Sequence, residues 1–287
     1  MRIAVVILNL NGGEAVLDAL RSVEGCERVV VDNASTDGSP ESIAATFPDV
    51  TLVRNDRNLG FAVAANQGVR ACDASVVVLL NNDATAAPGA VERLASTLDE
   101  TPSAAAVGAL IRNPDGSTQP SKRAFPTLWQ SVLHGLVGLV TSNNPGTRAY
   151  LMLDAPTDRP CRVGWVSASA VAYRREAFEA VGGFDEDYFF FVEDVDLCKR
   201  LTDAGWEVWF EPRAEVTHAW GGSWTKRPLR FMWMHQRNLF RYVTKHRRGA
   251  WVLAYPFIAA GLCLRFVLLA VRWLVVRRSV PSHRRTS

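Results

Sequence analysis

The feature that most constrains this chain is a series of short apolar runs, each of which ends in polar residues. The runs at 3–8, 29–31, 50–55 and 76–80 predict buried strands, and segments of helical character separate them. Strands that alternate with helices predict a doubly wound α/β fold with a parallel sheet, in which ligands bind beyond the carboxyl ends of the strands. We therefore expect a ligand site where polar residues follow the strands: Asn9 and Asn11, Asp32 and Asn33, and Asn81, Asn82 and Asp83.

The later part of the chain predicts shorter elements and two polar stretches. Helices are expected at 88–98 and 192–204, and strand character returns at 163–174 and 207–212. Residues 112–126 are rich in turn formers and predict a loop or a hairpin. Residues 141–162 are polar, contain Pro, Gly and Asp, and predict a mobile loop.

Charge is distributed very unevenly behind the small net value of +3. Residues 216–287 hold 14 Lys and Arg and no acid, which leaves 18 basic against 29 acidic residues in the rest of the chain. A basic end of this kind suggests nucleic acid or anionic lipid as a partner. The segment 251–276 is apolar except for Arg265 and Arg272, and nucleic-acid binding needs no such apolar stretch. We therefore expect a membrane surface as the partner and no nucleic acid.

The apolar segment 251–276 is long enough to cross a bilayer. Its two arginines would each cost roughly 2.5–3.5 kcal/mol at the bilayer centre, and at a spacing of seven they share one helix face. That pattern favours a helix that lies in the membrane interface. A tilted span and a buried C-terminal helix are the alternatives. The predicted organisation is a catalytic domain at 1–224, a basic helical connector at 225–250, and a membrane-associated helix with a basic tail at 251–287.

Several sites can be excluded from short motifs. The five cysteines form no CxxC pair, which argues against a zinc ribbon and a disulfide framework. The chain has no GxSxG, no Walker A motif and no GxGxxG after its first strand. A serine nucleophile, a P-loop and a Rossmann dinucleotide site are therefore not expected.

The acids and one histidine are the candidates for chemistry. Asp83 at a strand end can hold a divalent cation together with phosphate oxygens, and His218, which follows a strand, can complete a metal site. Glu193, Asp194 and Asp196 begin a helix, where acids also stabilise the helix dipole. Three acids behind an aromatic run exceed what capping needs, so one of them can serve as a general base.

Six segments, in this order, resemble family 2 glycosyltransferases of the GT-A fold. They are VVILNLNG, VVDNASTDGS, NLGFAVAANQG, VVLLNNDA, VGGFDEDYFFFVEDVDLCKRL and HAWGGSW, and the resemblance runs from about Ile3 to Trp224. The nearest branch is that of bacterial rhamnosyltransferases. The resemblance implies a Rossmann-like, mostly parallel sheet with flanking helices, followed here by the apolar and basic helical tail.

The resemblance also implies roles for individual residues. Asp194 would be the catalytic base, with Glu193 beside it. Asp83 and His218 would hold Mg²⁺ or Mn²⁺, and Asn81 stands where the family's metal motif has its first Asp. The donor would be bound by Asn9, Asn11, Asp32, Asn33, Asn58, Gly60, Phe61, Asn66, Asn81, Asn82 and Asp83, with Gly60 letting the backbone approach the nucleotide. The acceptor would meet Trp165, Ser167 and Trp220.

The implied activity is inverting, metal-dependent transfer of a sugar from a nucleotide-sugar donor to a hydroxyl of a lipid-linked or cell-envelope glycan, at the cytoplasmic face of the membrane. The best expectation for the donor is dTDP-L-rhamnose, and UDP-galactofuranose, UDP-GlcNAc and GDP-mannose stay open. A nucleotidyltransferase would want a basic, Gly-rich N-terminal loop, and LNLNGGEAV has no Lys or Arg. A non-catalytic, membrane-bound sugar-binding module is the remaining alternative.

Overall fold

A computed structural model describes residues 1–135, 137–139, 141, 143–219 and 228–279 of the chain. The chain forms two compact units, Met1–Gly221 and Gly222–Ser287. Trp220, which was expected to meet the acceptor, lies outside the described residues.

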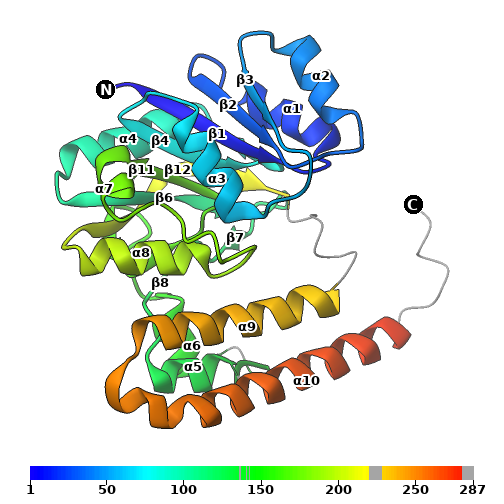
Figure 1. Ribbon diagram of the computed structural model, residues 1–287. Coiled ribbons are helices and arrows are strands. Elements are labelled where there is room, and N and C mark those ends of the chain that lie inside the picture. Colours follow the sequence, from blue (N-terminus) through cyan, green and yellow to red (C-terminus); the bar gives the residue numbers. More distant parts are fainter. Residues whose placement is uncertain (136, 140, 142, 220–227, 280–287) are drawn as a thin grey trace. The chain divides into compact units, whose positions relative to one another are not determined.

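The first unit is built on a large, mostly parallel sheet (Figure 1). Four parallel strands form its N-terminal half: β1 (Ile3–Asn9), β2 (Glu27–Asp32), β3 (Thr51–Arg54) and β4 (Val76–Asn81). They are connected by the helices α1 (Gly13–Arg21), α2 (Ser39–Thr46) and α3 (Phe61–Arg70). The four strands expected from the apolar runs are confirmed, and each of the four begins or ends within two residues of its predicted place.

The other half of the sheet mixes strand directions. The order across the sheet is β3-β2-β1-β4-β11-β6-β12-β5, and β11 is antiparallel to both of its neighbours. Its members are β5 (Ala84–Ala86), β6 (Ala104–Arg112), β11 (Ala170–Arg174) and β12 (Glu207–His218), with β7 (Thr118–Gln119) and β9 (Cys161–Val163) paired at the side. A second, small sheet pairs β8 (Lys122–Arg123) with β10 (Trp165–Val166).

Helices cover both faces of the large sheet. Residues of α1, α2 and α4 (Ala90–Glu100) pack with Val5 and Ile7 in one apolar core. On the other face, α3 packs so closely that a Cβ at Gly68 would lie 2.2 Å from Val6 Cγ1. The helices α7 (Arg175–Ala180) and α8 (Glu193–Asp203) lie on the same side as α3 (Figure 1).

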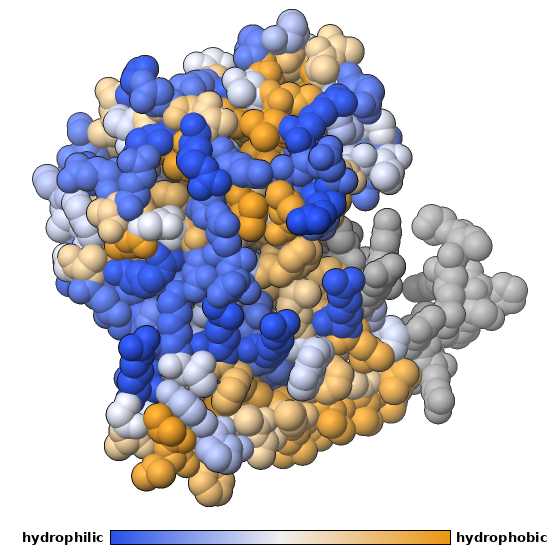
Figure 2. Space-filling model, in the orientation of Figure 1, coloured by the Kyte–Doolittle hydropathy of each residue, from blue (hydrophilic) through white to orange (hydrophobic). Residues whose placement is uncertain are grey.

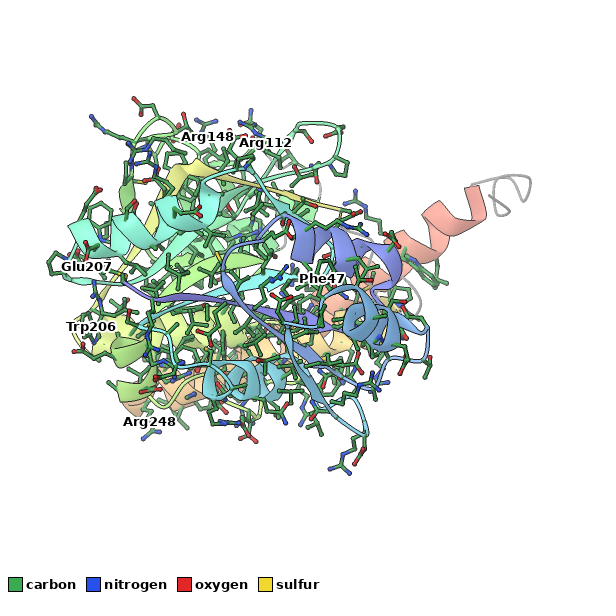
Figure 3. The ribbon with its side chains drawn as sticks, turned by 90° about the horizontal axis from the view of Figure 1, so that it is seen from above. Phe47, Arg112, Arg148, Trp206, Glu207 and Arg248 are labelled. Carbon is green, nitrogen blue, oxygen red and sulfur yellow. The ribbon has the colours of Figure 1, made fainter. Side chains whose placement is uncertain are left out.

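The long strand β12 lies between β6 and β5, one strand in from an edge of the sheet. It begins at Glu207, which follows Trp206 (Figure 3) and forms an ion pair with Arg162 at 2.9 Å. It ends at His218, which is the register partner of Ala84 in β5. The strand therefore carries its last side chain to the edge where β4 ends.

The expectation of a loop at 141–162 is confirmed only in part, because turns and bends occupy 151–160 but regular elements lie on both sides of them. The helix α6 (Pro145–Tyr150) lies inside it, after α5 (Leu128–Gly135) and the 3₁₀ turn η1 (Val137–Leu139), and β9 begins at its end. Asn144 caps α6, because its side chain accepts a hydrogen bond from the Thr147 N–H at 2.9 Å, and Pro145 occupies the first turn. The polar composition that predicted a loop is the composition of a helix start.

The second unit contains two long helices, α9 (Pro228–His246) and α10 (Tyr255–Ser279), joined by the 3₁₀ turn η3 (Gly249–Ala254). The stretch Gly249–Val275 is long and apolar enough to cross a membrane, and none of its most apolar window is buried. Apolar residues gather along α10 (Figure 2).

Candidate active site

The ends of β1 and β2 meet in a buried polar network. Asn9 and Asp32 are register partners on adjacent parallel strands, and Asn9 Nδ2 donates to Asp32 Oδ1 at 2.8 Å. The same amide donates to the Ser35 and Ser39 hydroxyls at 3.1 and 2.8 Å, and its oxygen accepts from Gly12 N–H. Asn9 is fully buried. Its side chain thus holds the two strand ends and the following loops in place.

The loop after β2 forms a row of polar groups beside Asn11. Asn11 has a positive φ of 54°, and its side-chain oxygen accepts from the Thr36 N–H at 2.8 Å. Asp37 Oδ2 accepts from the Gly13 N–H at 2.8 Å. Burial would raise the pKa of Asp37, but the hydrogen bonds from Ser39 and Gly13 outweigh it and hold that pKa below its ordinary value. Thr36 and Asp37 belong to this edge although no role was expected for them.

Asn33 connects the end of β2 to the start of α3. Its amide donates to the Gly60 carbonyl at 3.2 Å, and its oxygen accepts from Asn55 Nδ2 at 3.0 Å. Asn58 accepts from the Gly60 N–H at 2.9 Å. These bonds shape the turn in which Gly60 and Phe61 stand.

Gly60 is required by a close approach within the chain. Its φ is 90°, and a Cβ there would lie 2.6 Å from the carbonyl oxygen of Phe189. The N–H of Phe61 donates to the same oxygen at 2.7 Å. The close approach that the structure shows at Gly60 is therefore to the aromatic run before α8, whereas the sequence suggested an approach to a nucleotide.

Asn66 is also occupied inside the protein. It exchanges two hydrogen bonds with the Phe184 backbone, both at 2.9 Å, and donates to Glu186 at 3.0 Å. The side chain therefore fastens α3 to the turn that precedes the aromatic run. Its predicted contact with the donor stays a prediction.

Asp83 and His218 come together at the end of β4. His218 Nε2 lies 3.0 Å from Asp83 Oδ1 and 3.1 Å from Asn81 Nδ2. On the other side of the ring, Nδ1 lies 3.3 Å from Gln119 Oε1. When Nδ1 carries the proton and donates to Gln119, the Nε2 lone pair faces the carboxylate. This is how an outer hydrogen bond orients a ligating imidazole.

The chemistry of this pair fits a divalent cation. Carboxylate oxygen and imidazole nitrogen are both ligands of such ions, and two electron-rich atoms 3.0 Å apart are stabilised by a positive charge shared between them. Among the described residues, no group of three or more His, Cys, Asp or Glu side chains is placed to hold a metal. A cation at Asp83 and His218 would therefore need further ligands, such as the phosphate oxygens that commonly complete Mg²⁺ sites.

Glu193 and Asp194 open α8 with two carboxyl groups in different surroundings. Glu193 is buried, and its Oε2 finds no hydrogen-bond partner among the described residues. Burial, assisted by the neighbouring Asp194 carboxylate, raises the pKa of Glu193 well above its ordinary range. Glu193 therefore binds its proton more tightly than an ordinary glutamate does.

Asp194 is half-buried and accepts two backbone hydrogen bonds. Its Oδ1 accepts from the Val195 N–H at 2.8 Å, and its Oδ2 from the Ala168 N–H at 3.4 Å. Burial raises the pKa of Asp194, and these N–H groups and the charge of Arg123 oppose the rise. The result is a carboxylate with enhanced proton affinity, as a general base requires.

One short turn connects Asp194 to the pair of Asp83 and His218. Ala168 donates to Asp194, and the carbonyl of the next residue, Ser169, accepts from the Asn81 N–H at 3.0 Å. Asn81 in turn contacts His218. Residues from β4, β12, α8 and the turn after β10 therefore form a single site, although 135 positions separate Asp83 from His218.

Trp165 and Ser167 flank this turn. Trp165 is 7% exposed, lies under the guanidinium of Arg123 at 4.7 Å, and its indole N–H has no partner among the described residues. The Ser167 hydroxyl lies 3.0 Å from that of Ser169. Their predicted contact with an acceptor stays a prediction.

Two residues of the site had no signal in the sequence. Gln119 orients His218, and Arg123 stands over Trp165 and within reach of the charge of Asp194. Both come from the stretch 112–126, whose turn-rich composition says nothing about which side chains reach the site.

A protein-family model described as glycosyl transferase family 2 matches residues 4–182. The N-acetylglucosaminyl-diphospho-decaprenol L-rhamnosyltransferase of Mycobacterium tuberculosis is 36% identical over 270 residues, which cover 90% of this chain and 85% of the relative.

Two solved structures share the fold. The mannosyltransferase PcManGT of Pyrobaculum calidifontis, in complex with GDP-Man and Mn²⁺, matches with a TM-score of 0.59 and 20% identity, over 99% of this chain and 82% of its own. GalNAc-T7 with UDP, GalNAc and Mn²⁺ matches with a TM-score of 0.61 and 18% identity, over 85% of this chain and 48% of its own. Both were solved with Mn²⁺, and at these identities the likeness concerns the fold.

Proposed function

This chain belongs to glycosyl transferase family 2, and from that premise we propose that it transfers L-rhamnose from dTDP-L-rhamnose to a hydroxyl of a lipid-linked N-acetylglucosaminyl diphosphate. The sugar and the acceptor rest on the mycobacterial relative, which is named for both the rhamnose and the decaprenol-linked acceptor. The assignment of dTDP as the nucleotide rests on the resemblance of the motifs to the rhamnosyltransferase branch.

The observation that carries a catalytic role is the connection of Asp194 to Asp83 and His218 through Ala168 and Ser169. The reaction needs a base near the acceptor hydroxyl and a positive charge near the leaving diphosphate. The turn at 168–169 connects Asp194 to Asp83 and His218 at one edge of the sheet, which supports these two roles. A sugar-binding module without activity would need neither group.

In the proposed reaction, Asp194 takes the proton from the acceptor hydroxyl as its oxygen attacks the anomeric carbon. The attack comes from the face opposite the nucleotide, so a single displacement inverts the anomeric centre and forms no covalent intermediate with the protein. Asp83 and His218 would hold Mg²⁺ or Mn²⁺, which stabilises the developing charge of the leaving diphosphate as a Lewis acid. Burial raises the pKa of Glu193, which favours placing the negative charge of the pair on Asp194.

The strand ends would bind the nucleotide. The loops held by Asn9, Asp32 and Asn33 present backbone and side-chain groups at the edge where doubly wound sheets bind nucleotides. Because Asn9 is fully occupied inside the protein, its contribution to the donor site would come from holding these loops.

The second unit would place the enzyme at the cytoplasmic face of the membrane. An acceptor on a polyprenyl chain stays in the bilayer, and the exposed, apolar α10 with its basic surroundings suits that surface. The proposed division of the chain is therefore a catalytic domain at 1–224, a connector at 225–250 and a membrane-associated segment at 251–287.

A panel of nucleotide sugars separates the candidate donors. Thermal shifts would be measured with dTDP-L-rhamnose, UDP-galactofuranose, UDP-GlcNAc and GDP-mannose, each with and without Mn²⁺, and donor hydrolysis would be followed in parallel. We expect the largest shift and the fastest hydrolysis with dTDP-L-rhamnose and Mn²⁺. A preference for another donor would overturn the sugar assignment, and shifts without any hydrolysis or transfer would support the non-catalytic alternative.

A further inference from the structure

The two helices of the second unit form an antiparallel hairpin (Figure 1). Near its open end, Trp233 of α9 meets Phe266 of α10 edge to face, with ring centroids 5.4 Å apart. Near the turn, Phe240 meets Tyr255 at 6.1 Å. Because residue numbers rise along one helix as they fall along the other, the two helices lie side by side over most of their length.

The face of α10 that α9 leaves uncovered is a continuous apolar stripe. The spacing of its exposed members places them on one side of the helix, and they continue a patch that starts in η3. They are Leu253, Phe257, Leu264, Val267, Leu268, Val271, Leu274 and Val275. Figure 2 shows apolar residues gathered along this helix. Such a stripe is unfavourable in water over this length.

The arginine in the middle of α10 is directed towards α9. Arg265 Nη1 donates to Gln236 Oε1 at 3.0 Å, and Gln236 is buried. The charge is therefore held at the α9 side of the hairpin, away from the apolar stripe. Arg272, two turns later, is exposed near the end of the helix.

The length of α10 by itself would permit it to cross a bilayer. Its 25 residues span about 37 Å, more than a hydrocarbon core of about 30 Å. The packing of α9 against α10 makes such a crossing unfavourable. If α10 crossed, α9 would enter the core beside it and carry Arg237 and Arg241 with it, and charged side chains in the core are strongly disfavoured.

The charges of the hairpin fit a surface of anionic headgroups. Between residues 228 and 279 the chain has no acid. The basic residues of α9 recur at intervals of seven and four positions, which places them along one side of the helix, and two more follow in the turn: Arg230, Arg237, Arg241 and Lys245, then Arg247 and Arg248. Lipid phosphates are the complementary partner for such a row beside an apolar stripe.

We propose that the hairpin 228–279 lies in the plane of an anionic bilayer surface and does not cross it. The stripe of α10 is immersed just below the headgroups, and the exposed basic residues lie among the phosphates: Arg230 and Arg237 of α9, and Arg247 and Arg248 of the turn. Both ends of α10 then stay on the side of the membrane that holds the catalytic unit. This inference rests on the membrane association proposed above and specifies its geometry.

Cys263 provides a depth probe near the middle of the apolar stretch Gly249–Val275, because it is an exposed free thiol. The variant Cys26→Ser/Cys161→Ser removes the two half-buried thiols and leaves Cys72 and Cys198, which are buried. An environment-sensitive fluorophore on Cys263 of the full chain would be mixed with phosphatidylcholine vesicles that contain phosphatidylglycerol. Nitroxide lipids would carry the quencher either near the headgroup or near the methyl end of the acyl chain.

We expect the quencher near the headgroup to be the more effective one, since an interfacial helix lies about 5–10 Å into the boundary. Stronger quenching from the methyl end would place Cys263 at the bilayer centre and overturn the inference, while leaving membrane association intact. Failure of the labelled protein to bind the vesicles would overturn membrane association itself, and the inference with it.

Topology and charge give two independent checks. With Ser287→Cys as the labelled thiol, a membrane-impermeant maleimide added outside sealed vesicles should react fully, and protection of this residue would indicate crossing. Arg237→Gln should weaken binding to these vesicles about fivefold. The same substitution should leave binding to pure phosphatidylcholine vesicles unchanged, and an equal loss on both would contradict the contact with anionic phosphates.

Discussion

The pair Glu193 and Asp194 allows a sharp test of which carboxyl group acts as the base. Asp194→Asn and Glu193→Gln both keep the shape of the side chain and remove an ionisable group. Glu193 is buried without a partner for Oε2 among the described residues, and its pKa is raised well above the ordinary range. Glu193→Gln therefore replaces a carboxyl group whose neutral form is favoured by burial with a neutral amide, whereas Asp194→Asn removes the proposed proton acceptor.

The expected losses of kcat in the two variants differ by one or more orders of magnitude. General-base catalysis contributes about 10²–10⁴-fold, so Asp194→Asn should reduce kcat by that factor with little change in donor binding. That loss corresponds to about 3–5 kcal/mol of transition-state stabilisation. Glu193→Gln should retain kcat within about tenfold, or 1.4 kcal/mol, because no charge is lost.

The pH dependence gives the same test another readout. Turnover requires the unprotonated form of Asp194, so kcat should fall as the pH drops through the raised pKa of that carboxyl. If Glu193 were charged, Glu193→Gln would remove a negative neighbour of Asp194 and shift this fall in kcat to lower pH. If Glu193 is neutral, the fall in kcat stays at the same pH in the variant.

Stability should change in a defined direction as well. A glutamate whose pKa is raised in the folded state binds its proton more tightly there than in the unfolded chain. The wild-type protein should therefore lose stability as the pH rises from the ordinary glutamate range towards the raised pKa. Glu193→Gln lacks this loss, so its Tm should gain on the wild type over that window.

The assay is transfer from radiolabelled donor under single-turnover conditions, over a range of pH, with circular dichroism as the control for folding. Near-normal kcat in Asp194→Asn would refute the assignment of the base. A kcat for Glu193→Gln as low as that of Asp194→Asn would refute the neutral state of Glu193.

Three further predictions concern other parts of the chain. Asp83→Ala and His218→Ala should each weaken metal-dependent donor binding in calorimetry, and EDTA should abolish activity until Mn²⁺ or Mg²⁺ is restored; full activity in chelator would contradict the metal site. Gly60→Ala should destabilise the protein by about 1–3 kcal/mol or more, since strain at positive φ adds to a clash with a carbonyl oxygen. Its control is Gly89→Ala, where φ is 78° but space is open, and an equal fall in Tm would argue against the clash. Deletion of 251–287 removes the apolar helix and six of the 14 basic residues counted above, so the protein should leave the membrane fraction and keep slow donor hydrolysis. It should also lose more activity on a long-chain lipid acceptor than on a short analogue. Aggregation of the shortened protein would mean instead that the helix belongs to a core.

Local patterns were sufficient for the N-terminal half of the fold. The apolar runs of β1, β2 and β4 are strands buried on both faces of a parallel sheet, where apolarity is continuous and visible in the sequence, whereas the edge strand β3 is only half-buried. The strand β6 was not predicted from the sequence, because five of its nine residues are Ala or Gly, which have low β-propensity. Its place is decided by close packing, since a Cβ at Gly108 would lie 2.5 Å from Val166.

The succession of strands and helices along the N-terminal half and the polar residues at the strand ends were determined by the sequence alone, because each depends on neighbours in the chain. The meeting of Asp83 with His218 was decided by the register of β12, which pairs His218 with Ala84 across the sheet. The contact of Asp194 with Ala168 was likewise decided by the packing of α8 beside the turn after β10. In the second unit, the sequence showed an apolar helix with two arginines, and only the packing of α9 against it determined which face carries Arg265. Contacts between distant segments depend on how whole strands and helices are placed, and no local pattern of residues records that placement.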